Sequence, residues 1–379
     1  MTGNISKDSI IVMKFGGSSV QTEESRQHVI KHIRRNVESG KKVVPVVSAM
    51  GRKGDPYATD TLISLLKDVG EPVNPVELDS VMSIGERLSS AYFSHLLTIS
   101  GMPAAAFTGG QAGILTDDNP GNAEILEINT SNIRKALNEG KTAVVAGFQG
   151  VTSDGDVRTL GRGGSDTSAV SLGSSLGAEV VEIYSDVDGI ANCDPRQIPE
   201  AVFMDSVSVM QILSMADEGS KVIHPRAVRA SLKTKTEIIV RNTFNEKSGT
   251  IIYHNAPDKH SDQVALAHRD ELALIEFDKK TDALKTVPEL IPLDDQKFLL
   301  KNDVYFKSRI KELQKNFGTL KKDQDWATIS VVFDKPFTEI KDIQDAEIIQ
   351  SSKNTICYLL KEVDLFVSMR TLYNHYIRL

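Results

Sequence analysis

Glycine divides this chain into two unequal parts. Of its 26 glycines, only Gly318 lies after residue 262. Because glycine allows tight turns and close approach between backbone and ligand, a binding site is expected in the glycine-rich part. A chain of 379 residues is also too long for one ordinary core. We predict an N-terminal extension at 1–9, a first domain at 10–254, a polar linker at 255–262 and a second domain at 263–379.

The first part alternates short β-rich runs with helical patterns, which predicts an α/β fold around a mainly parallel sheet. Strands are expected at Ile10–Met13, Val43–Val47, Ala143–Ala146, Val180–Tyr184 and Ile238–Arg241. Helices are expected at Glu23–Val37, at Glu86–Ile99 with Leu88, Tyr92, Leu96 and Ile99 on one apolar face, and at Asp205–Ala216 with Asp205 as N-cap.

Two local signals qualify this pattern. Pro45 has no N–H to donate, so its strand is expected to be an edge strand or to begin after it. The Asp154-Gly155 pair predicts a hairpin turn within Val151–Leu160. That hairpin would lead directly into a segment rich in glycine and polar residues.

The second part predicts a smaller α+β domain. Its strands are expected at Leu272–Phe277, Ala327–Phe333 and Thr355–Leu360, and its helices at Lys307–Asn316 and Asp364–Tyr376. The scarcity of glycine indicates that this part is built on a different plan from the first.

Composition limits the partners of the chain. Its formal net charge of −7 argues against a general nucleic-acid binder or a binder of anionic membranes. The N-terminus is polar and no apolar run approaches the length of a membrane span, so neither secretion nor insertion is indicated. Cys193 and Cys357 cannot build a disulfide framework, and neither lies near a His/Cys cluster with metal-ligand spacing. We expect a cytoplasmic protein that binds small molecules.

The segment from Gly161 to Ser168 contains no apolar side chain and leads into a helical pattern. Its glycines would let the backbone approach a ligand, Ser165 or Asp166 could cap the helix, and the helix start would supply free N–H groups. Arg162 adds a planar fork for a carboxylate or phosphate, whereas Asp166 is unusual beside a phosphate. The segment predicts chemistry on an anion, with a solvated loop as the alternative.

A second glycine-rich turn follows the first expected strand, in the order Lys14-Phe15-Gly16-Gly17-Ser18-Ser19. Backbone N–H groups at the end of a strand can face phosphate oxygens, and a lysine there can neutralise charge that develops during phosphoryl transfer. The lysine precedes the glycines, so this is not a Walker A sequence, and the Rossmann spacing is absent. The turn predicts a phosphate loop, with an ordinary structural turn as the alternative.

A third polar turn, Ser185-Asp186-Val187-Asp188-Gly189, ends another expected strand and is followed by Asp194-Pro195-Arg196. Its carboxylates could orient Mg²⁺-bound nucleotide or bind its ribose, and Arg196 could contact phosphates. An EF-hand loop is excluded, because Gly189 lies too close to Asp186 and the closing glutamate is missing. A plain Asp-Gly turn remains the alternative.

Three further residues have a structural interpretation when each is taken alone. Glu86 follows Gly85 at the expected start of a helix, where an acidic residue is favoured electrostatically. Lys221 would be a solvated lysine after a helix, and His224 beside Pro225 a structural histidine rather than a base. No Ser/His/Asp or Cys/His arrangement can be assembled with any specificity.

Taken in order, these segments resemble the aspartate kinase branch of the amino-acid kinase family over roughly residues 9 to 252. The seven matching motifs are Lys14–Ser19, Val47–Gly51 with Thr59-Asp60, Ser83–Glu86, Ala146–Gly150 with Gly161–Asp166, Ser185–Arg196, Gly219–Arg226, and Arg241–Phe244 with Gly249-Thr250. Seven motifs in one order rarely recur by chance. The resemblance implies a three-layer αβα sandwich with a mainly parallel central sheet as the catalytic domain, followed by an ACT-like α+β domain.

The resemblance also implies an activity, namely transfer of the γ-phosphoryl group of ATP to the β-carboxylate of L-aspartate, the first step of lysine, threonine and methionine synthesis. Lys14 and Asp166 would be catalytic. Aspartate would be bound by Thr59, Glu86, Arg162, Gly163, Gly164 and Ser165, with Arg162 on its α-carboxylate and Glu86 on its amino group. The nucleotide would be bound by Lys14, Phe15, Gly16, Gly17, Ser18, Ser185, Asp186, Arg196, Lys221 and Val222. Mg²⁺ would bridge the phosphates.

The charges of these residues agree with that chemistry. An ionised β-carboxylate needs no general base, so the protein has mainly to position substrates and neutralise charge. Arg162 and Glu86 have opposite signs, as a zwitterionic amino acid requires. The alternatives are a catalytically silent sensor, against which intact Lys14, Asp166 and Lys221 argue, and a sibling kinase for another acceptor, against which the pairing of Glu86 with Arg162 argues.

Two features depart from the family pattern. Ala191 stands where some members have a tyrosine at the adenine site. Residues 263–379 resemble a shortened and diverged version of the two ACT regulatory units, with almost no glycine for effector-binding turns. We therefore expect inhibition by lysine or threonine to be weak or absent, and this domain to serve the assembly of a homodimer or larger homo-oligomer.

Overall fold

The computed structural model describes residues 9–220, 223–254, 263–280, 282–287, 290–302, 306–337 and 339–378. Contacts between Cα atoms divide the chain into two compact units. The first comprises Met1–Ile190, Phe203–Val209 and Val222–Ala256, and the second comprises Ala191–Val202, Met210–Lys221 and Pro257–Leu379. Two short segments that precede the expected linker, 191–202 and 210–221, therefore group with the second unit. The linker predicted at 255–262 lies outside the described residues.

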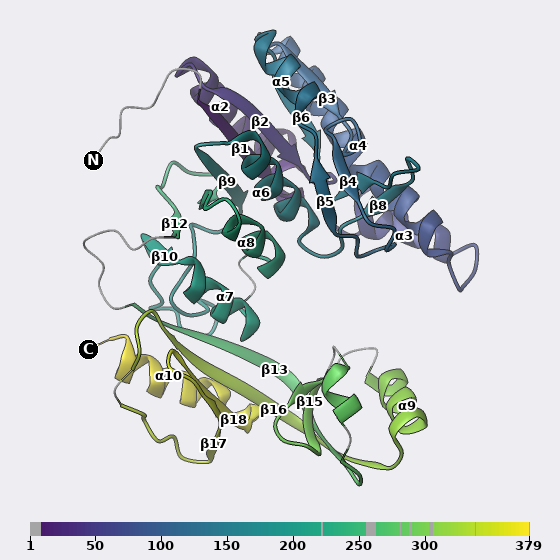
Figure 1. Cartoon of the computed structure of the whole chain (residues 1–379). Helices are drawn as coiled ribbons and strands as arrows, with labels where there is room; N and C mark the ends of the chain where they lie inside the picture. Colours follow the sequence, from purple (N-terminus) through teal and green to yellow (C-terminus); the bar gives the residue numbers. More distant parts are fainter. Residues whose placement is uncertain are drawn as a thin grey trace. The chain divides into compact units, whose positions relative to one another are not determined.

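The described part of the first unit is centred on an eight-stranded sheet (Figure 1). In spatial order its strands are β10 (Ser206–Ser208), β12 (Thr250–Tyr253), β11 (Glu237–Asn242), β9 (Val180–Ser185), β1 (Ile10–Phe15), β2 (Lys42–Val47), β6 (Thr142–Ala146) and β3 (Ala104–Phe107). Neighbouring strands run parallel except for β11 and β12. The predicted α/β fold with a mainly parallel sheet is confirmed, and all five predicted strands lie in it.

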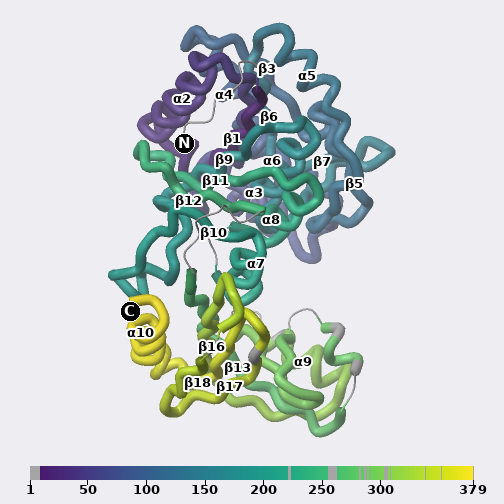
Figure 2. The backbone as a smooth tube through the Cα atoms, turned by 60° about the vertical axis from the view of Figure 1, so that its left-hand side comes forward, coloured from purple at the N-terminus to yellow at the C-terminus, as the bar shows by residue number. Residues whose placement is uncertain are grey.

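Helices cover both faces of this sheet, which gives three layers (Figure 2). The helices of the first unit are α1 (Gly17–Val20), α2 (Glu23–Glu38), α3 (Thr59–Lys67), α4 (Pro75–Ile99), α5 (Ser131–Asn138), α6 (Gly164–Leu176) and α8 (Pro225–Leu232). On one face, α2 and α4 pack against Ile11 and Met13 of β1. On the other, Gly173 of α6 lies against Val12. Since alternate residues of a strand share a face, Lys14 points toward α6 as Val12 does.

A small second sheet stands beside the main one and has the order β5 (Ile125–Ile128), β4 (Ile114–Thr116), β7 (Gln149–Val151), β8 (Val157–Thr159). The antiparallel pair of β7 and β8 is the predicted hairpin. Gly155 in its turn has φ 90°, a conformation that glycine adopts without strain. The hairpin returns the chain to Gly161 at the start of the glycine-rich segment.

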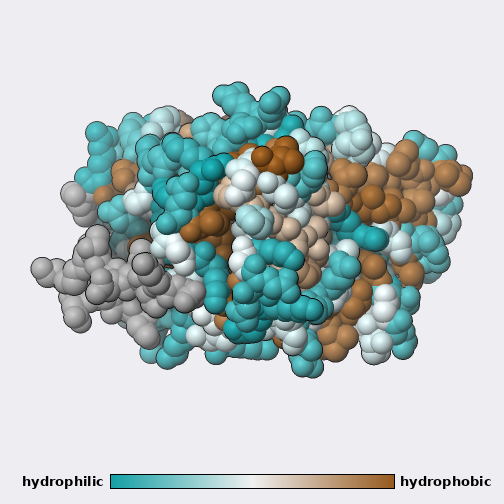
Figure 3. Space-filling view, turned by 90° about the horizontal axis from the view of Figure 1, so that it is seen from above, coloured by the Kyte–Doolittle hydropathy of each residue, from teal (hydrophilic) through white to brown (hydrophobic). Residues whose placement is uncertain are grey.

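The long helix α4 buries a different face from the one predicted. It begins at Pro75, not near Glu86, with Asn74 as its N-cap. Leu88, Tyr92 and Ile99 are exposed. The space-filling view in Figure 3 shows more generally that hydrophobic residues reach this surface, and they gather on the right of the face drawn. The buried residues are Asp79, Met82, Ser83, Gly85, Glu86, Ser89, Ser90, Phe93 and Leu97. The prediction was wrong because small side chains bring α4 close to its neighbours: a Cβ at Gly85 would lie 2.7 Å from the Cβ of Ala49.

Two shorter predictions were also wrong. Asp205 does not cap a helix, because Ser206–Ser208 pairs with β12 as strand β10, and α7 (Val209–Asp217) begins only afterwards. Pro45 lies inside β2, which is flanked by β1 and β6 and is not an edge strand. The ladder between β2 and β6 contains only Val46 and Val47, so it requires no hydrogen bond from Pro45.

The second unit contains a six-stranded antiparallel sheet within its described residues. In spatial order the strands are β14 (Ile291–Pro292), β15 (Lys297–Lys301), β13 (Val264–Phe277), β16 (Leu320–Phe333), β18 (Thr355–Lys361) and β17 (Ala346–Ser351). The helices are most of α7, then η1 (Asp282–Thr286), α9 (Phe306–Phe317), η2 (Glu362–Asp364) and α10 (Leu365–Tyr376). The predicted α+β architecture is confirmed. No helix among the described residues is long and apolar enough to cross a membrane.

The strands β13 and β16 are each 14 residues long and run through both halves of this sheet. Their pairing shifts register between Arg269 and Leu272, next to Glu271 with φ 52°. One buried cluster packs α10 against β16 and β18, and another packs α9 against β13 and β15. The second unit therefore has two cores that share two continuous strands.

Candidate active site

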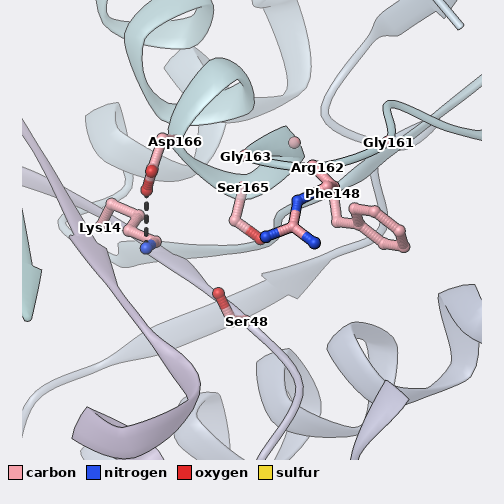
Figure 4. A pocket seen from close by; sticks show the side chains of 9 residues that line it. Lys14, Ser48, Phe148, Gly161, Arg162, Gly163, Ser165 and Asp166 are labelled. Carbon is pink, nitrogen blue, oxygen red and sulfur yellow. Dashed lines mark ion pairs between the residues drawn. The ribbon is translucent and has the colours of Figure 1, made fainter. Parts of the chain in front are cut away.

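A pocket lies where the central strands of the first unit end. Its volume is about 240 Å³, and it is lined by Lys14, Ser48, Phe148 and the residues from Gly161 to Asp166 (Figure 4). Lys14 lies near the carboxyl end of β1, while Ser48 and Phe148 follow the ends of β2 and β6. In parallel α/β sheets, loops from neighbouring strands meet at this edge, which is where ligands bind.

An ion pair lies in this pocket. The Nζ atom of Lys14 is 2.6 Å from Oδ1 of Asp166, and both side chains are largely buried. Lys14 points from β1 toward α6, and Asp166 lies in the first turn of α6, where a carboxylate is favoured. Figure 4 shows this pair on one side of the pocket, with Arg162 and Ser165 beside it and Phe148 on the far side. The structure thus brings into direct contact Lys14 and Asp166, the two residues that the family resemblance predicted to be catalytic.

The glycine-rich segment enters α6 earlier than predicted. The helix begins at Gly164, and its N-cap is Gly163 with φ 69° and no side-chain hydrogen bond. Ser165 and Asp166 therefore do not cap the helix, as the sequence had indicated, but occupy its first turn. A Cβ on Gly163 would lie 2.2 Å from the Cβ of His224, so only glycine fits there. N–H groups in a first helical turn have no intrahelical partner, which favours an anion in the pocket.

Phe148 has an unusual backbone conformation for a non-glycine residue, with φ 68°. Its N–H donates to Oγ of Ser168 at 3.0 Å, and its carbonyl accepts from the N–H of Leu160 at 2.9 Å. The preceding Gly147 has no room for a side chain, because a Cβ there would lie 2.9 Å from that of Ser165. Positive φ angles at non-glycine residues persist where neighbours hold them, often beside functional sites.

Glu86 is a buried carboxyl group with 3% of its surface exposed, and it does not line the pocket. Its Oε1 accepts from the N–H of Ala49 at 3.1 Å, and its buried Oε2 has no hydrogen-bond partner within the described part of the chain. Burial raises the pKa of Glu86 to about 8, against the opposing effect of the Ala49 hydrogen bond. Ala49 follows the lining residue Ser48. A cation brought to this carboxylate would favour its ionised form.

The turn after Lys14 is closely packed. A Cβ on Gly17 would lie 3.0 Å from the carbonyl oxygens of both Ala49 and Gly51. Phe15 is fully buried and stacks on Tyr184 with 4.9 Å between ring centroids, so only its backbone could face a ligand. Gly16 lies beside the Nζ atom of Lys14 and forms the N-cap of the short helix α1, which includes Ser18. The turn has the backbone geometry of a loop that could hold phosphate.

The other residues predicted to bind nucleotide or aspartate are more scattered. Ser185 ends β9, and the exposed Asp186 forms an ion pair with Arg52 at 3.1 Å. Arg196 belongs to the second unit, where it pairs with Asp194 at 2.6 Å. Thr59 is the first residue of α3 and does not line the pocket. Lys221 and Val222 lie outside the described residues.

His224 has the structural role that the sequence suggested. It is the N-cap of α8, where its Nδ1 accepts from the N–H of Arg226 at 3.3 Å. Burial and the nearby Arg226 hold the pKa of His224 below its usual value. A neutral ring is what this acceptor role requires.

Two lining residues, Ser48 and Phe148, had no role in the sequence-based interpretation. Both belong to motifs named above. Ser48 comes directly after the buried strand β2, and Phe148 comes two residues after the buried strand β6. Their position at the ends of β2 and β6 was the available signal, because the carboxyl ends of parallel strands share one edge. Among the described residues, no cluster of three or more Asp, Glu, His or Cys side chains could hold a metal ion.

The comparison with known families agrees with the geometry. Residues 9–242 match the sequence model of the Amino acid kinase family. The chain belongs to the amino acid kinase family. Within this family it is 46% identical to aspartokinase 1 of Bacillus subtilis over 243 residues, which is 64% of this chain and 60% of the relative. It is 42% identical to the aspartokinase of Mycolicibacterium smegmatis over 251 residues, 66% of this chain and 58% of the relative.

Solved structures of this family share the fold. Escherichia coli aspartokinase III in complex with aspartate and ADP superposes with a TM-score of 0.77 at 20% identity, covering 97% of this chain and 100% of that chain. The aspartate kinase of Synechocystis superposes with a TM-score of 0.58 at 28% identity, covering 96% of this chain and 69% of that one. The alignments with the two curated relatives span 58% to 60% of their length.

Proposed function

We propose that this chain is an aspartate kinase, which transfers the γ-phosphoryl group of ATP to the β-carboxylate of L-aspartate and gives 4-phospho-L-aspartate and ADP. This would be the first step toward lysine, threonine and methionine. The observation that carries the proposal is the pocket in which the Lys14–Asp166 ion pair lies beside Arg162. Identities of 46% and 42% with curated aspartokinases, within the kinase part of the chain, support aspartate as the acceptor.

In this proposal two opposite charges hold the acceptor. Arg162 is exposed at the pocket and makes no ion pair within the described ranges, so its guanidinium is free to clamp the α-carboxylate. Glu86 would receive the amino group, whose positive charge would offset the burial that keeps this carboxyl protonated. Ser165 and the N–H groups of Gly163 and Gly164 would add hydrogen bonds, and Thr59 would contribute from α3.

The transfer step would need positioning and positive charge, and no general base. The β-carboxylate is ionised at neutral pH and can attack phosphorus directly. Lys14 would stabilise the charge that develops on the transferred group, and the first turn of α6 would add N–H groups. Asp166 would hold the ammonium group of Lys14 in place through its contact of 2.6 Å.

The nucleotide would lie along the turn that follows β1. Gly16, Gly17 and Ser18, with the backbone of Phe15, would face its phosphates, and Ser185 and Asp186 would contribute from the end of β9. Mg²⁺ would arrive with the phosphates and lower their negative charge. Mg²⁺ commonly binds proteins in this way, keeping phosphate oxygens and waters as most of its ligands.

The decisive experiment is turnover by the full chain with ATP, Mg²⁺ and one of three acceptor conditions: L-aspartate, L-glutamate or none. Acyl phosphate is trapped with hydroxylamine and measured as the hydroxamate. We expect product with aspartate only. Equal turnover with glutamate would reject the choice of substrate, and no turnover under any condition would favour a silent sensor that kept the fold.

We propose two further properties for the second unit. Its sheet and two cores would serve assembly of a homodimer or larger homo-oligomer, which sedimentation velocity of the full chain tests.

Feedback inhibition would be weak or absent, since only Gly318 lies after residue 262 and effector-binding turns in ACT units contain glycine. Strong inhibition by lysine, threonine, methionine or diaminopimelate in the turnover assay would contradict this.

A further inference from the structure

The buried face of α4 carries a second carboxylate besides Glu86. Asp79 is fully buried and lies seven residues before Glu86, so the two share one face of the helix. Seven residues of α-helix span about 10 Å along the axis. Each carboxylate reaches a different segment of the first unit.

Asp79 is bound by three donor groups from two loops. One loop contains Gly121, and the other begins at Thr159, the last residue of β8. The N–H of Gly121 donates to both carboxylate oxygens at 3.0 Å. Thr159 donates its N–H to Oδ2 at 3.1 Å and its hydroxyl to Oδ1 at 2.5 Å. No cation pairs with Asp79 among the described residues, so these hydrogen bonds are what holds the carboxylate. Hydrogen bonds to an ionised acceptor are the strong kind.

The two loops lead to the acceptor side of the pocket. Thr159 ends β8, and Gly161 and Arg162 follow within three residues. Gly161 has φ 70°, and a Cβ on it would lie 2.9 Å from the carbonyl oxygen of Gly121, so the loops are in contact. Whatever fixes Thr159 and Gly121 therefore fixes the start of the segment that carries Arg162.

Arg226 braces the same two loops from the side of α8. Its Nη1 donates to Oδ1 of Asn122 at 2.8 Å and to the carbonyl of Leu160, and its Nη2 donates to the carbonyl of Ala123 at 2.7 Å. This brace joins the loops to each other and to α8. Among the described residues, the hydrogen bonds that join these loops to α4, the helix that carries Glu86, all go to Asp79.

We propose that Asp79 is a positioning residue that sets the distance between Glu86 and Arg162, and that it thereby selects the length of the amino-acid acceptor. This inference rests on the proposed function, in which these two residues hold the two charges of aspartate. With α4 as a rigid spacer, the β-carboxylate of aspartate meets the Lys14–Asp166 pair. Glutamate, longer by one methylene, places its carboxylate out of line.

The main variant is Thr159→Val, which removes one hydrogen bond to Asp79 and keeps the size of the side chain. We expect the KM for aspartate to rise about tenfold, as loss of a hydrogen bond to a charged group predicts, while the KM for ATP stays within about twofold. The ratio of kcat/KM for aspartate over glutamate falls. Thr159→Ser retains the hydroxyl group and should restore both the KM for aspartate and the ratio of kcat/KM for aspartate over glutamate.

The matched control is Asp118→Asn. Asp118 pairs with Arg158, the neighbour of Thr159, but is exposed and does not contact Asp79. This control should leave the KM values and the acceptor ratio unchanged. If Thr159→Val raises the KM for ATP and aspartate equally, lowers kcat alone, or is not rescued by serine, Asp79 is only structural and the inference is overturned.

A readout without turnover separates this inference from the proposed function. In Asp79→Asn, amide hydrogen exchange should rise at residues 119–123 and 159–163, because the amide cannot accept from all three donors, and should stay unchanged in α6. Unchanged exchange in both loops overturns the positioning role even in an active enzyme. If exchange rises in both loops of Asp79→Asn but the wild-type chain lacks aspartate kinase activity, Asp79 holds the loops in place but does not select the acceptor.

Discussion

Two carboxyl groups on the buried face of α4 are in opposite situations. Asp79, in the second turn of the helix, accepts hydrogen bonds from Gly121 and Thr159 on both of its oxygens. Glu86, near the middle of the helix, accepts one hydrogen bond from Ala49, and its Oε2 has no partner among the described residues. Burial costs both groups solvation, but among the described residues only Asp79 has hydrogen bonds to both of its oxygens. The comparison teaches that a buried carboxyl group whose two oxygens are hydrogen-bonded within the protein belongs to the framework, whereas one with an unbonded oxygen is suited to a ligand.

The largest effect is expected at the ion pair of the pocket. Lys14→Met removes the cation that would stabilise the transferred group, and we expect kcat to fall on the order of 10³-fold while urea unfolding shows that the variant still folds. The control is Lys31→Met, which removes an exposed lysine paired with Glu246 and should leave kcat within twofold. A fall in kcat of less than tenfold for Lys14→Met would contradict the catalytic role.

The next effect separates the two carboxylates of α4 by stability. Asp79→Ala leaves the buried N–H and hydroxyl groups of Thr159, and the N–H of Gly121, without their acceptor, and we expect the free energy of unfolding to fall by about 3 kcal/mol. Glu86→Gln loses little, because the amide oxygen can still accept from Ala49. Urea unfolding of both variants measures the difference. Equal destabilisation by the two substitutions would break the comparison.

The pH dependence of stability sharpens the same comparison. Burial raises the pKa of Glu86 from 4.5 to about 8, so the folded protein holds a proton there that the unfolded chain releases. Stability from this group is therefore full below pH 4.5 and is lost as pH rises toward about 8. We expect the melting temperature of the wild type, relative to Glu86→Gln, to fall between pH 5 and pH 8.5. A difference that does not change with pH would show that Glu86 ionises normally.

The smallest effect is expected at an exposed carboxylate. Glu246 contacts Lys31 at 2.9 Å and Arg35 at 2.5 Å, but all three side chains are open to solvent. Water screens such pairs, so Glu246→Gln should change the free energy of unfolding by less than about 0.5 kcal/mol in a urea titration. A loss of more than 1 kcal/mol would mean that burial does not decide how much Asp79, Glu86 and Glu246 each contribute to the free energy of unfolding.

The strands and the pocket could largely be predicted from the sequence. Runs of Val and Ile between polar turns predicted the parallel sheet. The two glycine-rich turns predicted that Lys14 and Arg162 lie at a site for an anion. These signals are local, because a buried strand and a glycine-rich turn each show themselves within a few residues. The pairing of Lys14 with Asp166 followed from family resemblance, and the structure brings their atoms together.

The faces of α4 could not be predicted in the same way. Apolar periodicity selected Leu88, Tyr92 and Ile99 for the core, but the buried face of α4 is the one that carries Gly85 and serines, because small residues allow closer packing. Asp79 gave no signal, since its partners are 42 and 80 residues away along the chain. The positive φ angle of Phe148 likewise depends on distant neighbours, not on its own residue type.

The two 14-residue strands of the second unit have a consequence for how this part of the chain can change in evolution. Because β13 and β16 pass through both cores, the halves are not separable modules joined by loops. Recombination that replaced one half with that of a relative would have to cut within paired strands, where each break interrupts a ladder of hydrogen bonds. The unit is therefore expected to be inherited whole, and to diverge by substitution more readily than by exchange of parts.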